Sequence, residues 1–123
     1  MFGMLALTYT NQIGKVMNHF LKWQDHVGSQ PEKFYKTALW QGDHAMVGLN
    51  CLEPGQTQKT HTHEGADKFY FVLEGSGVFT VGDEEANAGV GWLIIAPSGI
   101  PHGVTNIGHE RLSILVSISP LFK

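Results

Sequence analysis

The chain has one cysteine, few charged residues and no long apolar run among its 123 residues. A single thiol, Cys51, cannot form a disulfide within the chain, which favours a reducing cytosol. No segment approaches the roughly 18 apolar residues that a membrane-spanning helix needs. The apolar stretch 1–9 lacks the basic start of a secretory signal. We therefore expect a cytoplasmic protein that does not interact with a membrane.

Positive charge is also scarce. Eight lysines and arginines stand against eleven aspartates and glutamates, so the net charge is -3 at pH 7. Such a balance gives no electrostatic reason to expect a nucleic-acid partner. Apolar residues make up 42% and charged residues 15%, which is typical of one ordinary globular domain.

The chain divides into two parts that differ in the types of residue they contain. Residues 1–36 are predicted to form an N-terminal arm, partly helical around residues 16–26 and followed by turn-forming residues. Met17 is an alternative to Met1 as the start, which would make residues 1–16 a dispensable extension. Residues 37–123 carry β-forming runs and are predicted to form the main domain.

Short β-compatible runs alternate with turn residues from residue 37 onward. The run Trp92 to Ile95 is expected to be a buried strand, with Trp92 in the core, and Val78 to Val81 a hairpin strand turned at Gly82-Asp83. Turn signals every 8 to 12 residues predict an all-β sandwich or barrel. The predicted strands cover residues 37–41, 45–52, 57–63, 69–73, 78–81, 92–95 and 112–119.

Three histidines occupy a pattern that suits a metal site. His61 and His63 are two residues apart, and side chains at i and i+2 of a strand share one face. His102 follows a Pro/Gly turn after a separate strand. Three neutral imidazoles that converge bind a divalent transition metal such as Fe, Mn, Ni, Zn or Cu.

The surrounding residues resemble a known family. Gly55-x5-His61-x-His63, continuing to Gly75, is similar to the first cupin motif, and the run from Gly91 to Asn106, with Pro97, Gly99 and His102, is similar to the second. The 15 residues between Gly75 and Gly91 match the spacing of small single-domain cupins. The resemblance implies a double-stranded β-helix, the cupin jelly-roll barrel. It also implies a metal held by His61, His63, His102 and one acidic residue.

The acidic position of the motif carries Lys68 in this chain, with Asp67 beside it. Three interpretations remain open. A bulge could turn Asp67 inward as the fourth ligand. Water could complete a three-histidine site. Regular alternation could instead place Lys68 and Tyr70 on the inner face, with a weakly held or absent metal, because an ammonium repels a divalent cation.

The resemblance predicts a metal-binding cupin that acts on a small molecule, as a non-haem metal oxygenase or an isomerase-like enzyme. The alternative is a non-catalytic cupin that binds or senses a small ligand or a metal. Lys68 and Tyr70 are the candidate pocket residues, and Lys68 could anchor a substrate carboxylate. Because the strand edges of a small barrel need cover, we also expect a homodimer.

Overall fold

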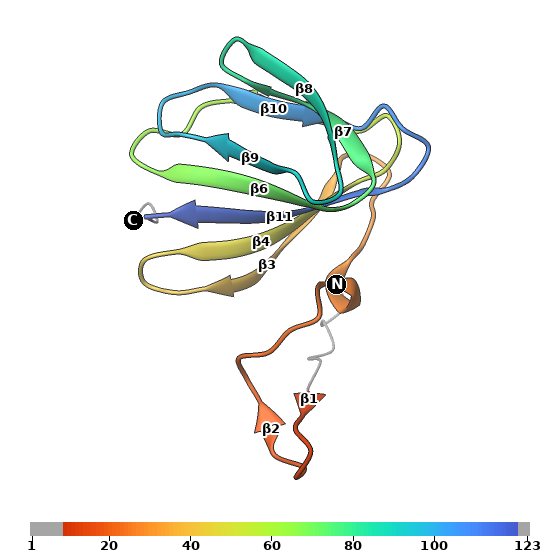
Figure 1. The fold of residues 1–123 in the computed structure, drawn as a ribbon, viewed down its shortest axis with the longest axis vertical. Helices are drawn as coiled ribbons and strands as arrows, with labels where there is room; N and C mark the ends of the chain where they lie inside the picture. Colours follow the sequence, from red (N-terminus) through yellow and green to blue (C-terminus); the bar gives the residue numbers. More distant parts are fainter. Residues whose placement is uncertain (1–8, 121–123) are drawn as a thin grey trace.

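Two antiparallel sheets face each other in the computed structural model, which describes residues 9–120 (Figure 1). The larger sheet has five strands, in the order β3 (Tyr35–Gln41), β4 (Met46–Leu52), β11 (Leu112–Ser119), β6 (Asp67–Glu74) and β9 (Leu93–Ala96). The smaller sheet has four strands, in the order β5 (Thr57–His61), β10 (His102–Thr105), β7 (Ser76–Val81) and β8 (Glu84–Gly89). This architecture confirms the predicted all-β jelly-roll barrel.

The core lies between the two sheets and follows the period of two expected for strands. In β6 the side chains of Lys68, Tyr70 and Val72 are buried, while their neighbours along the strand are more exposed. The buried apolar residues of both sheets form one cluster: Leu52, Tyr70, Val72, Phe79, Ala88, Val104, Leu112, Ile114 and Val116. Because this cluster fills the interior toward one end, the inner faces at the other end remain available for a site.

Several strand predictions need correction. Strand β10 lies outside every predicted strand, and the strand predicted over residues 57–63 ends at His61, before His63. Residues 84–89 form β8, which the sequence did not predict, because Glu-Glu-Ala-Asn-Ala-Gly has little β propensity. It pairs with β7 across the predicted Gly82-Asp83 turn, where Val81 lies opposite Glu84. The prediction of a buried strand around Trp92 was wrong. Strand β9 is an edge strand, and Trp92, Leu93 and Ile95 are each more than half exposed.

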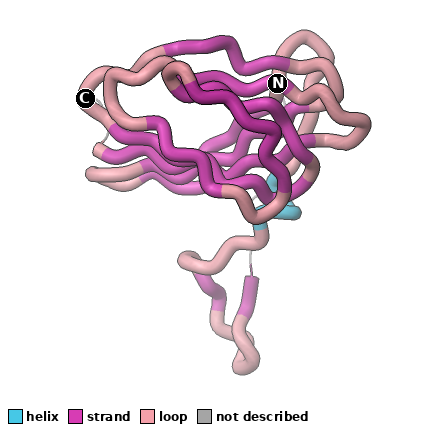
Figure 2. The backbone as a smooth tube through the Cα atoms, turned by 45° about the horizontal axis from the view of Figure 1, so that its top comes forward, coloured by secondary structure: helices cyan, strands magenta, loops and turns pink. Residues whose placement is uncertain are grey.

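The N-terminal arm extends away from the barrel in Figures 1 and 2. It contains a two-stranded ribbon of β1 (Tyr9–Thr10) and β2 (Val16–Met17), then a 3-10 helix η1 (Trp23–His26). The predicted helix over 16–26 is therefore present only in its last four residues. None of the helices in residues 9–120 is long and apolar enough to span a membrane. Met1 lies outside the described residues.

Candidate metal centre

Three histidine side chains converge at the open end of the barrel. His61 ends β5 and His102 begins β10, and the two are direct cross-strand partners. Their rings lie 4.3 Å apart, because residues directly opposite each other in an antiparallel pair share one face. His63 follows in the loop after β5, two residues beyond the point where the strand ends. One ligand nitrogen from each histidine lies within 4.8 Å of the other two, so the group could hold a metal ion.

A β-bulge in β5 sets the direction of His61. His102 faces His61 and Val104 faces Gln58, so Gly103 alone lies opposite both Lys59 and Thr60. The extra residue brings Gln58 and His61, three positions apart, to the same inner face. Gly103 permits this packing, because a Cβ there would lie 2.9 Å from the Gln58 carbonyl oxygen and 3.0 Å from the Thr60 nitrogen.

Backbone carbonyls orient two of the three rings. His61 Nδ1 lies 2.8 Å from the Lys59 carbonyl oxygen, and His102 Nδ1 lies 2.9 Å from that of Ile100. A carbonyl can only accept, so each Nδ1 carries the proton and each Nε2 keeps its lone pair. Among the described residues, the buried Nε2 of His102 has no hydrogen-bond partner. An oriented ring with a buried, unpartnered lone pair fits a metal ligand.

The electrostatic environment keeps two of these rings neutral. Burial lowers the pKa of His63, and the positive charges of Lys68 and Lys36 lower it further. Burial also lowers the pKa of His102, although its hydrogen bond to Ile100 opposes the change. A neutral imidazole is the form that binds a metal. Both residues are therefore in the ligating state at neutral pH.

Lys68 points into the barrel and reaches the histidines. Its side chain is only 6% exposed, and Nζ lies 3.5 Å from His61 Nε2 and 4.8 Å from the centre of the Tyr70 ring. Burial, followed by the charge of Lys36, lowers the pKa of Lys68 to about 8. Strand β6 pairs regularly here, with Lys68 opposite Ile118 on one side and Ala96 on the other. The structure thus favours the regular alternation over the bulge considered at Asp67.

Asp67 is not brought to the histidines. Its side chain is exposed, and its carboxylate accepts a hydrogen bond of 2.9 Å from the Ser98 backbone N–H. Ser98 Oγ in turn accepts from Gly65 N, and Gly99 N donates to the His63 carbonyl. Asp67 therefore ties the loop that carries His63 to the turn that precedes His102. Alternation along β6 directs it away from the interior, which is the physical reason that it does not join the cluster.

Tyr70 acts on the site through a neighbour. Its ring is fully buried in the core, and its hydroxyl donates a 2.8 Å hydrogen bond to Gln58 Oε1. Burial raises the pKa of Tyr70, so the hydroxyl stays protonated. We had expected Tyr70 to line the pocket because of its place in the sequence. In the structure it does not line the pocket directly. It fixes the amide of Gln58, which does.

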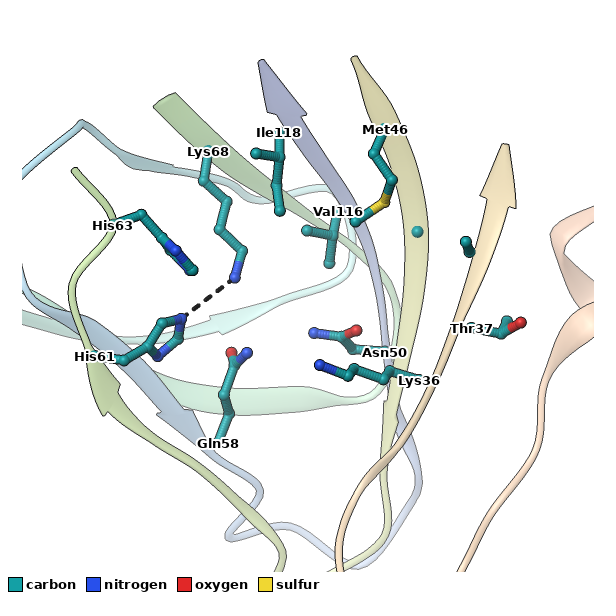
Figure 3. A pocket seen from close by; sticks show the side chains of 12 residues that line it. Lys36, Thr37, Met46, Asn50, Gln58, His61, His63, Lys68, Val116 and Ile118 are labelled. Carbon is teal, nitrogen blue, oxygen red and sulfur yellow. Dashed lines mark hydrogen bonds between the residues drawn. The ribbon is translucent and has the colours of Figure 1, made fainter. Parts of the chain in front are cut away.

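A pocket of about 500 Å³ adjoins the histidines (Figure 3). Lys36, Asn50 and Gln58 also line the pocket, although the sequence did not reveal them. They lie on β3, β4 and β5, which come together only through the order of the strands in the two sheets. Figure 3 shows His61, His63 and Lys68 directed toward one another, with Lys36 reaching in from the other side. The lining residues are Lys36, Thr37, Ala38, Met46, Gly48, Asn50, Gln58, His61, His63, Lys68, Val116 and Ile118.

Known proteins with similar sequences or structures share this barrel. A structure from Thermus thermophilus is 39% identical, with a TM-score of 0.81, over 84% of this chain and 98% of that one. An uncharacterized protein of Streptomyces coelicolor is 36% identical over 60% of this chain and 69% of its own length. An oxalate-binding protein of Thermotoga maritima is 33% identical, and the match covers 54% of this chain and 55% of that protein. The sequence profile of the cupin domain matches residues 48–118, and the chain belongs to the cupin family.

Proposed function

We propose that this protein is a metal-binding cupin that acts on a small molecule, with a divalent transition metal held by His61, His63 and His102. The main observation in support of this proposal is that one ligand atom from each of the three imidazoles lies within 4.8 Å of the others. The buried, unpartnered Nε2 of His102 supports the same site from the described residues around it. Fe, Mn, Ni, Zn and Cu all accept nitrogen ligands of this kind.

Three protein ligands leave coordination positions for a substrate, which favours an enzyme over a closed structural site. A redox-active ion would supply dioxygen chemistry for an oxygenase, and a redox-silent ion would supply a Lewis acid for an isomerase-like reaction. The chain itself provides a buried ammonium at Lys68 and an oriented amide at Gln58. Val116 and Ile118 line the same pocket and give it an apolar side.

The second candidate function is a non-catalytic protein that binds or senses a small ligand. The Thermotoga maritima relative, named as an oxalate-binding protein, favours this alternative. In the described residues, no carboxylate joins the three histidines. A binding protein requires only the pocket and its polar groups, whereas an isomerase-like enzyme also requires a group that moves a proton.

Metal analysis tests the site. Protein purified without a chelator or histidine tag should contain about one metal ion per chain, and His61→Ala and His102→Ala should lose it. His109→Ala is the matched control, because His109 is exposed and lies outside the cluster. Metal that remains after both substitutions would overturn the proposed ligands.

Turnover separates the two functions. Oxygen uptake and product formation should be followed with the metal-loaded protein and a panel of diketones, thiols, catechols and small carboxylic acids. Turnover that depends on His63 identifies an enzyme. Saturable binding without turnover across the panel identifies the binding protein.

We further propose a homodimer that forms through the edge of the larger sheet, in a protein located in the cytosol. Leu93 and Ile95 on β9 are exposed apolar side chains on an unpaired edge, which soluble proteins usually cover. The cytosolic location rests on the single, buried thiol of Cys51. Light scattering should give twice the chain mass for wild type and a lower mass for Ile95→Glu. A monomer mass at every concentration would contradict the dimer.

A further inference from the structure

The pocket beside the histidines carries two ammonium groups and no carboxylate. Lys36 and Lys68 are its charged lining residues apart from histidine, and none of its twelve lining residues is an aspartate or glutamate. The salt bridge that Arg111 forms with Glu53 lies elsewhere. The pocket is therefore positive before any metal enters it.

Burial of Lys68 without an acidic partner is unfavourable for folding. Lysine is almost never fully buried unless it is paired, because a buried ammonium loses its hydration. The side chain is 6% exposed, and its polar contact in the protein is a 3.5 Å approach to a histidine nitrogen. A weak neutral partner does not replace the lost hydration. An anionic ligand in the pocket would supply the missing partner.

The neutral polar groups of the pocket also favour an anion. Tyr70 donates its hydroxyl proton to Gln58 Oε1, which turns the Nε2 donor of Gln58 the other way. Asn50 directs its amide group into the same space from β4 (Figure 3). Amide and ammonium donors therefore meet from three sides.

The two lysines are well separated in the sheet. Lys36 lies on β3 and Lys68 on β6, with β4 and β11 between them. Three strand spacings separate them by about 14 Å across the sheet. The register adds about 13 Å along the strands, because Lys36 aligns with Ile114 of β11 through Asn50, whereas Lys68 pairs with Ile118. Both side chains reach inward from there. A ligand that contacts both must have acceptors at two places. The pocket volume of about 500 Å³ suits a small organic molecule of this kind.

We propose that the pocket binds a small dicarboxylate, with one carboxylate at Lys68 and the histidine cluster and the other at Lys36. The proposal rests on the metal site proposed above and names the ligand class of that site. Neutral imidazoles leave the full charge of a divalent ion in place, and the two lysines add to it. A dianion balances this charge better than a monoanion does.

Such a ligand also removes a conflict between Lys68 and the metal. The ammonium lies beside His61 Nε2, where a bound divalent cation would repel it. A carboxylate between them attracts both. Metal and dicarboxylate should therefore strengthen each other's binding, and linkage requires that the two effects be equal.

Calorimetry of the full chain tests this ligand class. Succinate should be titrated into the metal-free and the Zn²⁺-loaded protein, beside the monoanion succinamate and the neutral succinamide. We expect succinate to bind at least about ten-fold more tightly than succinamate, and succinamide not to bind. Malonate and glutarate, one methylene shorter and longer, then report the preferred spacing of the two carboxylates.

Lysine variants locate the two ends. Lys36→Met and Lys68→Met should each weaken succinate binding by about ten-fold, because each removes one charge-assisted contact. Lys33→Met, at an exposed lysine outside the pocket, should change it by less than about two-fold. Succinate should also raise Zn²⁺ affinity in wild type, and less so in Lys68→Met.

The outcomes separate this inference from the metal site. If Zn²⁺ binds with one ion per chain and no dicarboxylate binds, or if both lysine variants bind succinate as wild type does, the inference is overturned and the metal site stands. If Zn²⁺ does not bind but succinate does, with loss in both lysine variants, the anion site is supported and the metal proposal is overturned.

Discussion

Lys68 Nζ lies 3.5 Å from Nε2 of His61, the ring nitrogen that is left to bind a metal once Nδ1 donates to the Lys59 carbonyl. A single ammonium thus lies beside a lone pair that the proposed metal requires. In the metal-free protein, the ammonium of Lys68 therefore lies where it would oppose metal binding to His61. With the metal and the proposed ligand bound, the same ammonium would contact the ligand.

Replacement of Lys68 by methionine should stabilise the metal-free protein. The pKa of Lys68 is lowered from 10.5 to about 8, so folding disfavours its charged form. The cost is complete below pH 8 and disappears as the pH rises from 8 to 10.5, the value in the unfolded chain. We expect Lys68→Met to raise the free energy of unfolding by about 1–3 kcal/mol at pH 7. Urea denaturation at pH 7 and pH 10.5 checks this, and an equal gain at both values would refute it.

Lower pH should destabilise the metal-free protein through the buried His102 and the half-buried His63. The folded-state pKa values of His63 and His102 lie below the 6.5 of the unfolded chain. Below pH 6.5 the unfolded state therefore binds more protons, and stability falls as the pH falls. The loss between pH 7.5 and 5.5 should be smaller in His102→Gln, where one of these groups is absent. Equal losses in the two proteins, measured by urea denaturation, would exclude a contribution from His102.

Gly103→Ala should disrupt the bulge that directs His61. The added Cβ would lie 2.9 Å from the Gln58 carbonyl oxygen and 3.0 Å from the Thr60 nitrogen, and these backbone atoms are not free to move aside. We expect a loss of about 1–3 kcal/mol in stability, together with weaker metal binding. The control is Gly89→Ala in β8, where the nearest atom to the new Cβ is 3.8 Å away. A stable Gly103→Ala protein with full metal affinity would show that the bulge does not position His61.

Asp67→Ala should keep its metal affinity and lose stability. The Asp67 carboxylate accepts from Ser98 N rather than facing the histidines, so its removal leaves a backbone donor without this partner. Because this hydrogen bond is exposed and water can replace the carboxylate, the expected cost is about 0.5–1 kcal/mol. Metal titration and thermal unfolding of the same samples separate the two properties. A large drop in metal affinity at unchanged stability would return Asp67 to the ligand set.

The pattern of histidines and glycines was sufficient to predict the barrel and the meeting of His61, His63 and His102. His61 and His63 are close together in the chain, but His102 lies on another strand and was placed with them by the resemblance of both motifs to cupins. The period of two along β6 favoured an inner face shared by Lys68 and Tyr70, and both side chains are buried there. This was one of three open interpretations, and the sequence also offered Asp67 as a ligand, which the structure does not bring to the histidines. Of these predictions, only the alternation along β6 depended on residues close together in the chain.

The features that the sequence did not reveal depend on strand pairing. The bulge at Lys59 and Thr60 exists only relative to Gly103 on β10. Lys36 reaches the pocket because β3 lies at the edge of the five-stranded sheet, which no local pattern specifies. Trp92 was predicted to be buried because its segment is apolar, but apolar composition does not distinguish an edge strand from a central one.

The hydrogen bonds that join the loop of His63 to the turn before His102 involve the amides of Gly65, Ser98 and Gly99. Since the three bonds link the same two segments, separation of the segments would break all of them at once. Once the intrinsic rate of each amide is taken into account, their deuterium exchange should therefore report one common free energy of opening, as for a single cooperative opening. These amides would act as built-in reporters of how often the mouth of the barrel opens, even in protein that has never bound a metal.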